Sequence, residues 1–248
     1  ELYESYGELV DQLNNTYITA GDVGTSVKDL ISINKSTKYV SGIKIETSAP
    51  TARGIFNSIN IIYKFITHKE LKESTVAISG VGKVGSKLSK LLFEKKLNLI
   101  VSNIGRDAII KLKEDKISFT ESDINKIFEK ECDIISPCAL GSAINSEVKK
   151  KLKCKAIVGA ANNQLDKPET AVWLKKNNIF YAPDYLVNSG GVIAISCEIN
   201  NSEDILNDQL NKIGDKVLSL LKESQKSNLS TDKIAEDLAW RRINNPVI

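Results

Sequence analysis

The chain has 248 residues, of which 42% are hydrophobic and 26% are charged, and its formal net charge is +3. These values are ordinary for a globular protein that buries one large core or two modest ones. The 34 basic and 31 acidic residues are spread along the chain, and no apolar run is long enough for a membrane span. We therefore expect no nucleic-acid partner and no membrane partner.

The first part of the chain combines short elements with a glycine-flanked turn. Gly21 and Gly24 free the backbone around Asp22, and Thr25 or Ser26 can cap the helix that follows. Taken alone, Asp22 is more typical of a turn residue that bonds its own backbone than of a catalytic base. The expected elements are a helix over Leu2–Leu13, a strand over Tyr17–Ala20 and a helix over Val27–Ile33.

A long and largely buried helix is predicted next. Ser48 is an N-cap candidate, and Pro50 suits the first turn of a helix. His68, the only histidine, lies at the polar end of this helix and is more typical of a surface residue than of a catalyst. The apolar stripe consists of Ile55, Ile59, Ile62 and Ile66.

The stretch from Thr75 to Val101 has the pattern of a dinucleotide-binding βαβ unit. An apolar strand, Thr75–Ile78, precedes glycines at G-x-G-x-x-G spacing, a helical stripe follows at once, and a second apolar run covers Leu97–Val101. In such a turn the first glycine permits the sharp bend, the second lets the backbone approach a pyrophosphate, and the third brings the helix close to the strand. The three are Gly80, Gly82 and Gly85.

One position departs from this fingerprint. The second strand usually ends in an acidic residue that accepts from the ribose hydroxyls, and Asn103 occupies that place. Asn103 can still bond a ribose but cannot repel a 2′-phosphate. Arg106 could attract such a phosphate, or it could cap a surface turn. The residues alone leave the choice between NAD and NADP open.

Strands and helices continue to alternate after the fingerprint, which predicts a Rossmann-like α/β fold with a doubly wound parallel sheet. Ligands bind at the carboxyl ends of such strands. Those ends carry Gly80, Asn103, Pro137, Cys138, Asn162, Asn163 and Asp184. The expected strands are Cys132–Cys138, Ala156–Ala161 and Ile179–Ala182, and the expected helices are Asp123–Phe128, Asn145–Leu152 and Pro168–Lys176, with further helices opening at Gly190, near Leu206 and at Ser230.

Four cysteines carry no metal-binding or redox motif. Cys132, Cys138, Cys154 and Cys197 show neither C-x-x-C nor metal-ligand spacing. We therefore expect free thiols in a reducing cytoplasm and no metal site.

Several phrases of the sequence, taken together, resemble the glutamate/leucine/phenylalanine/valine dehydrogenase family, and its leucine dehydrogenase branch most of all. They occur in order and cover nearly all of the chain from Tyr17 onward. They are YITAGDVGTS, APTA, GVGKVG, CDIISPCALG, GAANNQL and YAPDYLVNSGGV.

The resemblance implies NAD-dependent oxidative deamination of an apolar L-amino acid to its 2-oxo acid and ammonia. Asp22 matches the aspartate that shuttles protons at the substrate amine, and this chemistry needs a base within hydrogen-bond reach. Thr51 matches the threonine that bonds the nicotinamide amide, Asn162 an asparagine at the nicotinamide ribose, and Asn188 one that faces the substrate. The positions of the side-chain pocket are Ala20, Val192 and Ile195. The cofactor-binding positions are Thr51, Gly80, Val81, Gly82, Lys83, Val84, Gly85, Asn103, Pro137, Cys138, Ala139, Ala161 and Asn162.

Family habit favours NAD over NADP, against the local sequence at Asn103, and a homo-oligomer. The division that the resemblance implies is a remainder of the substrate domain over residues 1–47, a Rossmann domain over residues 48–200, and C-terminal helices over residues 201–248 that pack back on the substrate domain.

Two departures from the family pattern bear on activity. The family's paired lysines bind the carboxylate and activate water, one of them in a G-G-x-K segment, but here the only Gly-Gly pair is followed by Val192. The loop before APTA is also shortened, to Ile43–Thr47. Methionine is absent as well, so either the sequence is part of a longer protein or modified methionines have been omitted, and we expect an N-terminal portion with the lysines to be missing. Without them the chain would bind cofactor but turn over little or nothing, and a non-catalytic dinucleotide-binding homologue is the alternative.

Overall fold

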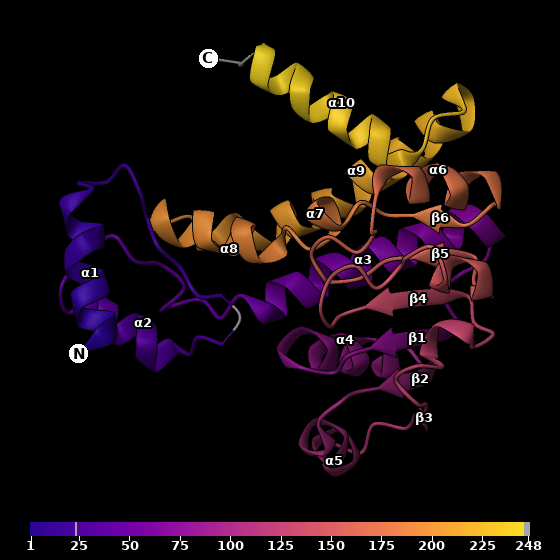
Figure 1. Cartoon of the computed structure of the whole chain (residues 1–248), viewed down its shortest axis with the longest axis horizontal. Coiled ribbons are helices and arrows are strands. Elements are labelled where there is room, and N and C mark those ends of the chain that lie inside the picture. Colours follow the sequence, from indigo (N-terminus) through magenta and orange to yellow (C-terminus); the bar gives the residue numbers. More distant parts are fainter. Residues whose placement is uncertain (23, 246–248) are drawn as a thin grey trace.

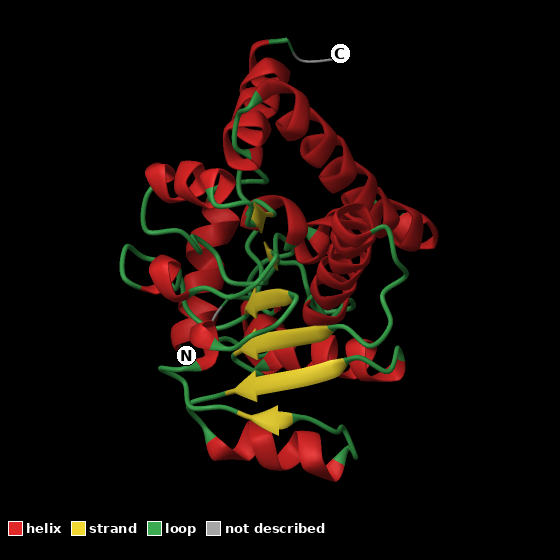
Figure 2. Ribbon diagram, turned by 90° about the vertical axis from the view of Figure 1, so that its right-hand side faces the viewer, coloured by secondary structure: helices red, strands yellow, loops and turns green. Residues whose placement is uncertain are grey.

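A computed structural model describes residues 1–22 and 24–245 (Figure 1). Its centre is one six-stranded sheet in which every neighbouring pair is parallel, in the order β3-β2-β1-β4-β5-β6. Figure 2 shows the strands with their arrows running the same way. This is the strand order of Rossmann folds, so the predicted fold class is confirmed. The strands are β1 (Thr75–Ser79), β2 (Asn98–Ser102), β3 (Thr120–Glu121), β4 (Ile134–Pro137), β5 (Ala156–Ile157) and β6 (Phe180–Tyr181).

The two faces of the sheet are buried by different elements, as side-chain alternation along β1 requires. Val76 and Ile78 pack into the main core with helices α3 (Ser48–Thr67), α4 (Lys83–Glu94) and α5 (Arg106–Glu114). Ala77 faces the other way, into a small cluster with Ile127 and Ile135. The sheet is thus the middle layer of the fold. The carboxyl ends of its strands lie together on one side and are not covered by these helices.

The remaining helices cover the β6 side and the N-terminal side of the molecule (Figure 1). α3 and α9 form a long packed pair beside the sheet, and α8 continues from them towards α1 and α2, which pack on each other away from the sheet. No helix in the described part of the chain is both long and apolar enough to cross a bilayer. The bounds are α1 (Leu2–Gln12), α2 (Val27–Asn34), α6 (Pro168–Lys176), α7 (Asp184–Val187), α8 (Gly190–Ile199), α9 (Leu206–Ser227) and α10 (Thr231–Asn244), with 3-10 turns η1 (Ile127–Glu129), η2 (Val148–Lys151) and η3 (Glu203–Ile205).

Two predicted helices are wrong, because each segment forms only one short turn. The segments expected to be helical over Asp123–Phe128 and Asn145–Leu152 contain only η1 and η2. Asp123 Oδ1 accepts from the Asn125 N–H at 2.7 Å, and Asn145 Oδ1 accepts from the N–H groups of Glu147 and Val148 at 3.0 Å each. These bonds are typical of helix caps, but the turns that follow end at the extended residues Lys130 and Leu152.

Smaller differences lie at the sheet edge and near the N-terminus. The strand expected over Tyr17–Ala20 is a single parallel bridge between Thr19 and Val40. The sequence analysis did not predict β3, α5 or α7, each of which is short. Ser26, one of the two proposed caps, does cap α2, in a reciprocal capping box with Asp29.

Candidate active site at the carboxyl edge of the sheet

The ends of β1, β4 and β5 meet at one edge of the sheet. The Cys138 N–H donates to Ser79 O at 2.7 Å, and the Ala161 N–H donates to Pro137 O at 2.9 Å. Burial of its sulfur raises the pKa of the Cys138 thiol, which therefore stays protonated, although the residue as a whole is partly exposed. The structure thus brings together the strand-end residues that the sequence places at a ligand site.

The three glycines of the first turn have different surroundings. Gly80 has a φ of +96°, and a Cβ there would lie 2.9 Å from the Cβ of Ala139. A Cβ on Gly85 would lie 2.0 Å from the carbonyl oxygen of Gly80. Gly82 has an ordinary φ of −70°, and a Cβ there would meet nothing within 4 Å. Packing inside the protein requires Gly80 and Gly85 but leaves open space beside Gly82.

That open space lies at the positive end of α4. The first N–H groups of a helix have no partner inside it, and no side chain caps α4. Lys83, the first helical residue, is exposed, and Val84 packs partly into the core. Uncapped N–H groups beside free volume fit a diphosphate, so the turn fits the nucleotide that the sequence predicts.

Asn103 is bound to this same turn. Its Oδ1 accepts from the Val81 N–H at 3.0 Å, and its Nδ2 donates to Gly105 O at 2.8 Å. The amide therefore links the ends of β1 and β2. Each of its polar atoms still has capacity for one more bond, and a bond to ribose stays a prediction.

Arg106 begins helix α5 rather than capping a loop. Its guanidinium forms an ion pair with Glu121 at the end of β3, and Lys113 lies 3.6 Å from the same carboxylate. The Arg106 side chain is 66% exposed. A carboxylate therefore stands beside the arginine at the sheet edge next to Asn103, a feature that the sequence analysis missed because β3 was not predicted.

Two asparagines meet beyond β5 and α7. Asn188 Nδ2 donates to Asn162 Oδ1 at 2.6 Å and to Ala160 O at 3.2 Å. The buried Gln164 fixes the loop that carries Asn162, since its Nε2 donates to Gly159 O at 2.8 Å and to Ala161 O at 3.0 Å. Both predicted asparagines thus project from one hydrogen-bonded unit.

A buried carboxylate holds that unit in place. Asp184 Oδ2 accepts from the Gln164 N–H at 2.8 Å and from the Tyr181 hydroxyl at 3.2 Å. Burial, followed by the charge of Asp184, raises the pKa of Tyr181 and keeps its hydroxyl a donor. The sequence analysis placed Asp184 among the strand ends and gave Gln164 no role, and the structure shows that both support the loop that carries Asn162.

Thr51 lies where α3 and α8 touch. A Cβ on Gly190 would lie 2.2 Å from Pro50 O, and one on Gly191 would lie 2.9 Å from Thr51 Oγ1. The Thr51 hydroxyl donates to Thr47 O at 2.8 Å, which leaves its lone pairs as acceptors. The glycine pair thus lets α8 approach the predicted nicotinamide-binding threonine.

The N-terminal segment reaches this edge through a few polar contacts. Glu198 on α8 accepts from the N–H groups of Gly42 and Ile45, at 3.2 and 3.1 Å. Lys83 Nζ donates to Thr25 O at 2.8 Å, and the N–H of Asp22 donates to Thr25 Oγ1 at 2.7 Å. The structure therefore joins the turn that carries Asp22 to the start of α4.

The three residues predicted to form the side-chain pocket lie on two segments of the chain. Val192 and Ile195 lie on α8, where Val192 is 70% exposed and Ile195 is half-buried. Ala20 follows Thr19, whose carbonyl accepts from the Ser41 N–H at 2.9 Å. Their role as pocket residues stays a prediction.

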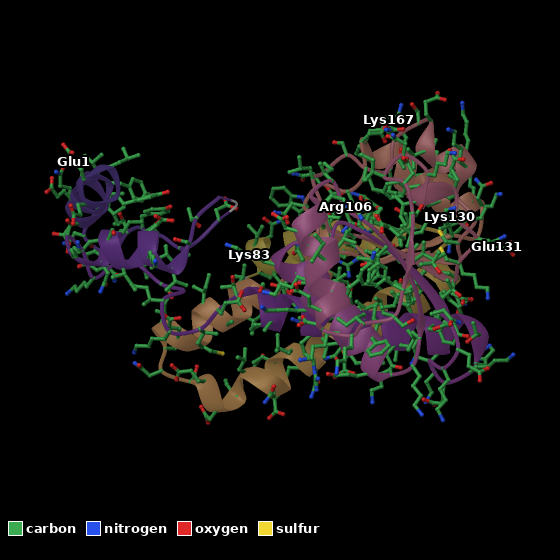
Figure 3. The ribbon with its side chains drawn as sticks, turned by 90° about the horizontal axis from the view of Figure 1, so that it is seen from below. Glu1, Lys83, Arg106, Lys130, Glu131 and Lys167 are labelled. Atoms are coloured by element: carbon green, nitrogen blue, oxygen red, sulfur yellow. The ribbon has the colours of Figure 1, made fainter. Side chains whose placement is uncertain are left out.

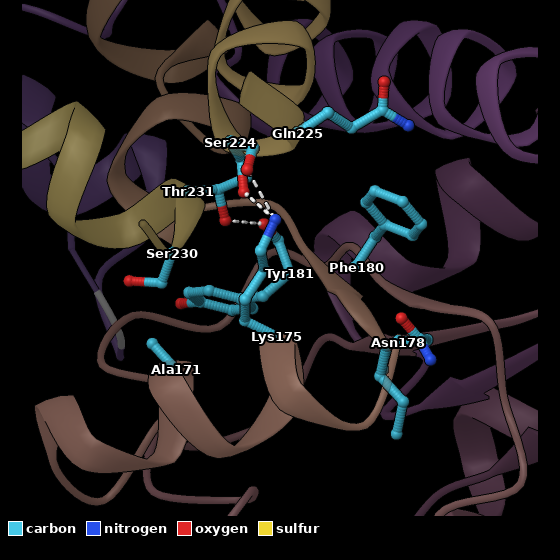
Figure 4. A pocket seen from close by; sticks show the side chains of 10 residues that line it. Ala171, Lys175, Asn178, Phe180, Tyr181, Ser224, Gln225, Ser230 and Thr231 are labelled. Carbon is cyan, nitrogen blue, oxygen red and sulfur yellow. Dashed lines mark hydrogen bonds between the residues drawn. The ribbon is translucent and has the colours of Figure 1, made fainter. Parts of the chain in front are cut away.

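A separate cavity of about 210 Å³ lies between α6, β6 and the C-terminal helices (Figure 4). Lys175 Nζ donates there to Ser224 O at 2.5 Å and to Ser224 Oγ at 3.0 Å. Asn178 and Ile179, which precede β6, also line it. The cavity is therefore at the amino end of a strand, away from the edge with the glycine turn, and Lys175 serves there to bind the end of α9.

Comparison with known proteins identifies the family. Residues 41–243 match the profile of the family described as Glutamate/Leucine/Phenylalanine/Valine dehydrogenase. The chain belongs to this family. It is 35% identical to phenylalanine dehydrogenase from Thermoactinomyces intermedius and 36% identical to leucine dehydrogenase from Bacillus subtilis (strain 168), in each case over 98% of this chain and 69% of the relative.

Solved structures agree with this assignment. L-tryptophan dehydrogenase from Nostoc punctiforme superimposes with a TM-score of 0.84 at 32% identity, covering 98% of this chain and 72% of that one. A hetero-hexameric glutamate dehydrogenase from Thermus thermophilus gives 0.74 at 14% identity over 93% and 64%, which shows a shared fold alone. The chain is therefore a member of an oxidoreductase family of amino-acid dehydrogenases.

Two contacts of this dehydrogenase were missed for lack of any local pattern. Glu198 bonds backbone N–H groups more than 150 residues before it in the chain, and Lys83 bonds a carbonyl 58 residues before it. Such bonds leave no periodic trace in a sequence. The GVGKVG phrase did mark Lys83 as a binding residue, but nothing in it pointed to Thr25.

Proposed function

We propose that the protein catalyses NAD-dependent oxidative deamination of an apolar L-amino acid to the 2-oxo acid and ammonia. The observation that carries the proposal is the glycine turn, where Gly82 alone borders open space at an uncapped helix start. Family membership supports the reaction type, and the polar strand-end residues support the placement of a dinucleotide. NAD, when bound, would accept the hydride that leaves the α-carbon.

The protein's own residues would then orient the reactants and move a proton. Thr51 would accept a hydrogen bond from the carboxamide of the nicotinamide through its free lone pairs, while Asn162 would bind the ribose and Asn188 the substrate. Asp22 would take a proton from the substrate amine, because hydride departure requires an amine that can lose its charge. Ala20, Val192 and Ile195 would form an apolar wall that selects an aliphatic or aromatic side chain.

Production of NADH with a panel of L-amino acids, measured on the full-length protein, tests the reaction. We expect turnover with apolar amino acids such as leucine, valine or phenylalanine. Absence of turnover with every aliphatic and aromatic amino acid would overturn the proposal.

Asp22→Asn tests the proposed base. We expect turnover to fall by about 100-fold or more, with NAD affinity unchanged, because proton transfer contributes on that scale. Thr16→Ala, at an exposed threonine outside the proposed site, is the matched control. Unchanged turnover in the Asp22 variant would end its catalytic role.

A non-catalytic dinucleotide-binding homologue is the second candidate. It is favoured by one observation, the lack of a G-G-x-K segment in these 248 residues. Tight NADH binding without turnover by the full-length protein would select it. If the gene encodes a G-G-x-K segment upstream of Glu1, this candidate loses its support.

For the cofactor we propose NAD, with NADP as the competitor. Glu121 supports NAD, because its carboxylate pairs with Arg106 and adds negative charge beside the sheet edge where a 2′-phosphate would lie. Comparison of the dissociation constants of NADH and NADPH decides the matter. Tighter NADPH binding would contradict the proposal.

We also propose a homo-oligomer in the cytoplasm, with residues 1–47 as part of a substrate domain, residues 48–200 as the nucleotide domain and residues 201–248 as C-terminal helices. Exposed apolar side chains on α1 and α10 support self-association, among them Leu2, Leu9, Trp240 and Ile243. The free cysteines suit a reducing compartment. Light scattering after size-exclusion chromatography tests the assembly, and a monomer at micromolar concentration would contradict it.

A further inference from the structure

Lys83 is the charged residue of the turn that runs from Gly80 to Gly85. It is the first residue of α4, follows Gly82 directly, and is exposed. Its ammonium group reaches away from the sheet and donates to Thr25 O at 2.8 Å. Figure 3 shows Lys83 between the N-terminal segment and the start of α4. One side chain thus spans the two parts that would have to come together around a substrate.

Thr25 forms hydrogen bonds with both the N–H group and the carbonyl oxygen of Asp22. The Thr25 hydroxyl accepts from the Asp22 N–H at 2.7 Å and donates to Asp22 O at 2.7 Å, and the Thr25 N–H donates to Asp22 O at 3.1 Å. These three bonds join Thr25 to the backbone of Asp22. A contact that fixes the Thr25 carbonyl therefore also fixes the backbone of Asp22.

The charge of Lys83 is only partly compensated in the described part of the chain. Lys87, one turn further along α4, pairs with Glu46 at 3.3 Å. Lys83 forms no such ion pair with a described carboxylate; Asp29 feels its charge, but the pKa of Asp29 is lowered mainly by hydrogen bonds from Ser26. An ammonium has three N–H donors, and the Thr25 carbonyl takes one. Two remain for a second acceptor.

We propose that Lys83 couples the dinucleotide site to the Asp22 turn. The inference rests on the proposed function, since it needs a diphosphate at the start of α4. The ammonium group would bind a diphosphate oxygen and the Thr25 carbonyl at the same time, so that the bound anion holds Lys83 in place and Lys83 holds the turn. Lys83 is then a positioning residue, which acts on the reaction through the backbone of Asp22. By linkage, an ordered turn would in return tighten dinucleotide binding.

Hydrogen exchange of the full-length protein, with and without saturating NADH, tests the coupling. In the wild type we expect NADH to slow exchange both in peptides of the glycine turn and in peptides that contain Asp22 and Thr25. In Lys83→Met, saturated with NADH, we expect the glycine turn to remain protected while the Asp22 peptides lose their protection. The dissociation constant of NADH should also rise about tenfold or more, the order expected for the loss of one charge-assisted hydrogen bond.

Two further variants separate coupling from a general structural effect. Lys83→Arg keeps the charge and the donors, so it should restore protection of the Asp22 peptides. Lys87→Met removes the neighbouring Lys87–Glu46 pair but not the contact to Thr25, so it should retain the coupling. Lys83 is exposed, and its variants should unfold at the wild-type midpoint.

The outcomes distinguish the two proposals. If NADH protects the glycine turn but not the Asp22 peptides in the wild type, or protects them equally in Lys83→Met, the coupling is wrong and the dinucleotide site stands. If NADH protects neither region in the wild type, the dinucleotide site itself fails. Loss of protection in Lys87→Met as large as in Lys83→Met would assign the effect to general loosening and overturn the role of Lys83.

Discussion

The central sheet and the N-terminal segment are held in different ways. The sheet is enclosed by fully buried aliphatic side chains such as Ile78, Ile134 and Ile59, which form one continuous core with α3 and α4. The pair α1 and α2 has a small core around Val10, Leu30 and Ile33. Polar contacts made by Glu198, Lys83 and Lys87 help tie the segment to the nucleotide-binding part. The site therefore combines a rigid half with a half whose position is sensitive to charge.

The largest loss of stability is expected from a substitution in the glycine turn. Gly85→Ala places a Cβ 2.0 Å from Gly80 O, so α4 must move off β1. We expect a loss of about 3 kcal/mol or more in unfolding free energy, as for overpacked cores. Gly82→Ala meets no protein atom and should cost less than about 0.5 kcal/mol. Urea denaturation compares the two, and equal destabilisation would contradict the assignment of different roles to these glycines.

A matched pair of isoleucines compares the two cores directly. Ile78→Ala in β1 should cost about 3 kcal/mol and Ile33→Ala in α2 about 2 kcal/mol, because the small N-terminal core collapses more easily around a deleted side chain. Ile33→Ala should also open α1 and α2 locally without unfolding the sheet. Urea titrations followed by limited proteolysis measure both effects. A larger loss at Ile33 than at Ile78 would show that the N-terminal pair is not the weaker half.

Neutralising the carboxylate on α8 should loosen only the N-terminal side. Glu198→Gln replaces a charged acceptor of three backbone N–H groups, those of Gly42, Lys44 and Ile45, by a neutral one, so we expect a cost of about 1 kcal/mol. Faster hydrogen exchange at Gly42 and Ile45, with the sheet unchanged, is the measurement. Glu203→Gln, at an exposed carboxylate, is the control. Equal exchange in the two variants would show that Glu198 does not hold the N-terminal segment in place.

The smallest effect is expected at the sheet edge beside Asn103. Arg106 already pairs with Glu121, so Arg106→Ala should leave NADH affinity unchanged and alter NADPH affinity by less than tenfold. Isothermal titration with both cofactors measures this. A selective loss of NADPH binding greater than about 1.4 kcal/mol, a factor of ten, would show that the arginine serves a 2′-phosphate.

The contrast between the buried core and the polar contacts also explains which helices and strands could be predicted from the sequence. Periodic apolar patterns predicted β1, β2 and α4 closely, and caps such as Ser26 and Ser230 marked the starts of α2 and α10. The sequence failed where an element is too short to show a period, as in α5, whose nine residues hold a single buried pair, Ile109 and Leu112. It also failed after Asp123 and Asn145, which cap segments that form only a 3-10 turn.

The same limit applied to the residues of the site. Strand-end residues could be placed together because parallel strands end at one edge. The ties made by Lys83 and Glu198 run from a side chain to the backbone of a distant segment, and no spacing rule predicts them. The polar contacts on which the position of the N-terminal half depends were therefore visible only in the structure.

Titration of NADH into the wild type and into Gly82→Ala tests the central claim most directly. Because Gly82 borders open space and has an ordinary φ, the variant should fold as the wild type does. The account predicts that the wild type binds NADH and that the added methyl group weakens binding at least tenfold, since it occupies the space of the diphosphate. Equal affinity of the two proteins, or no binding by the wild type, would contradict it.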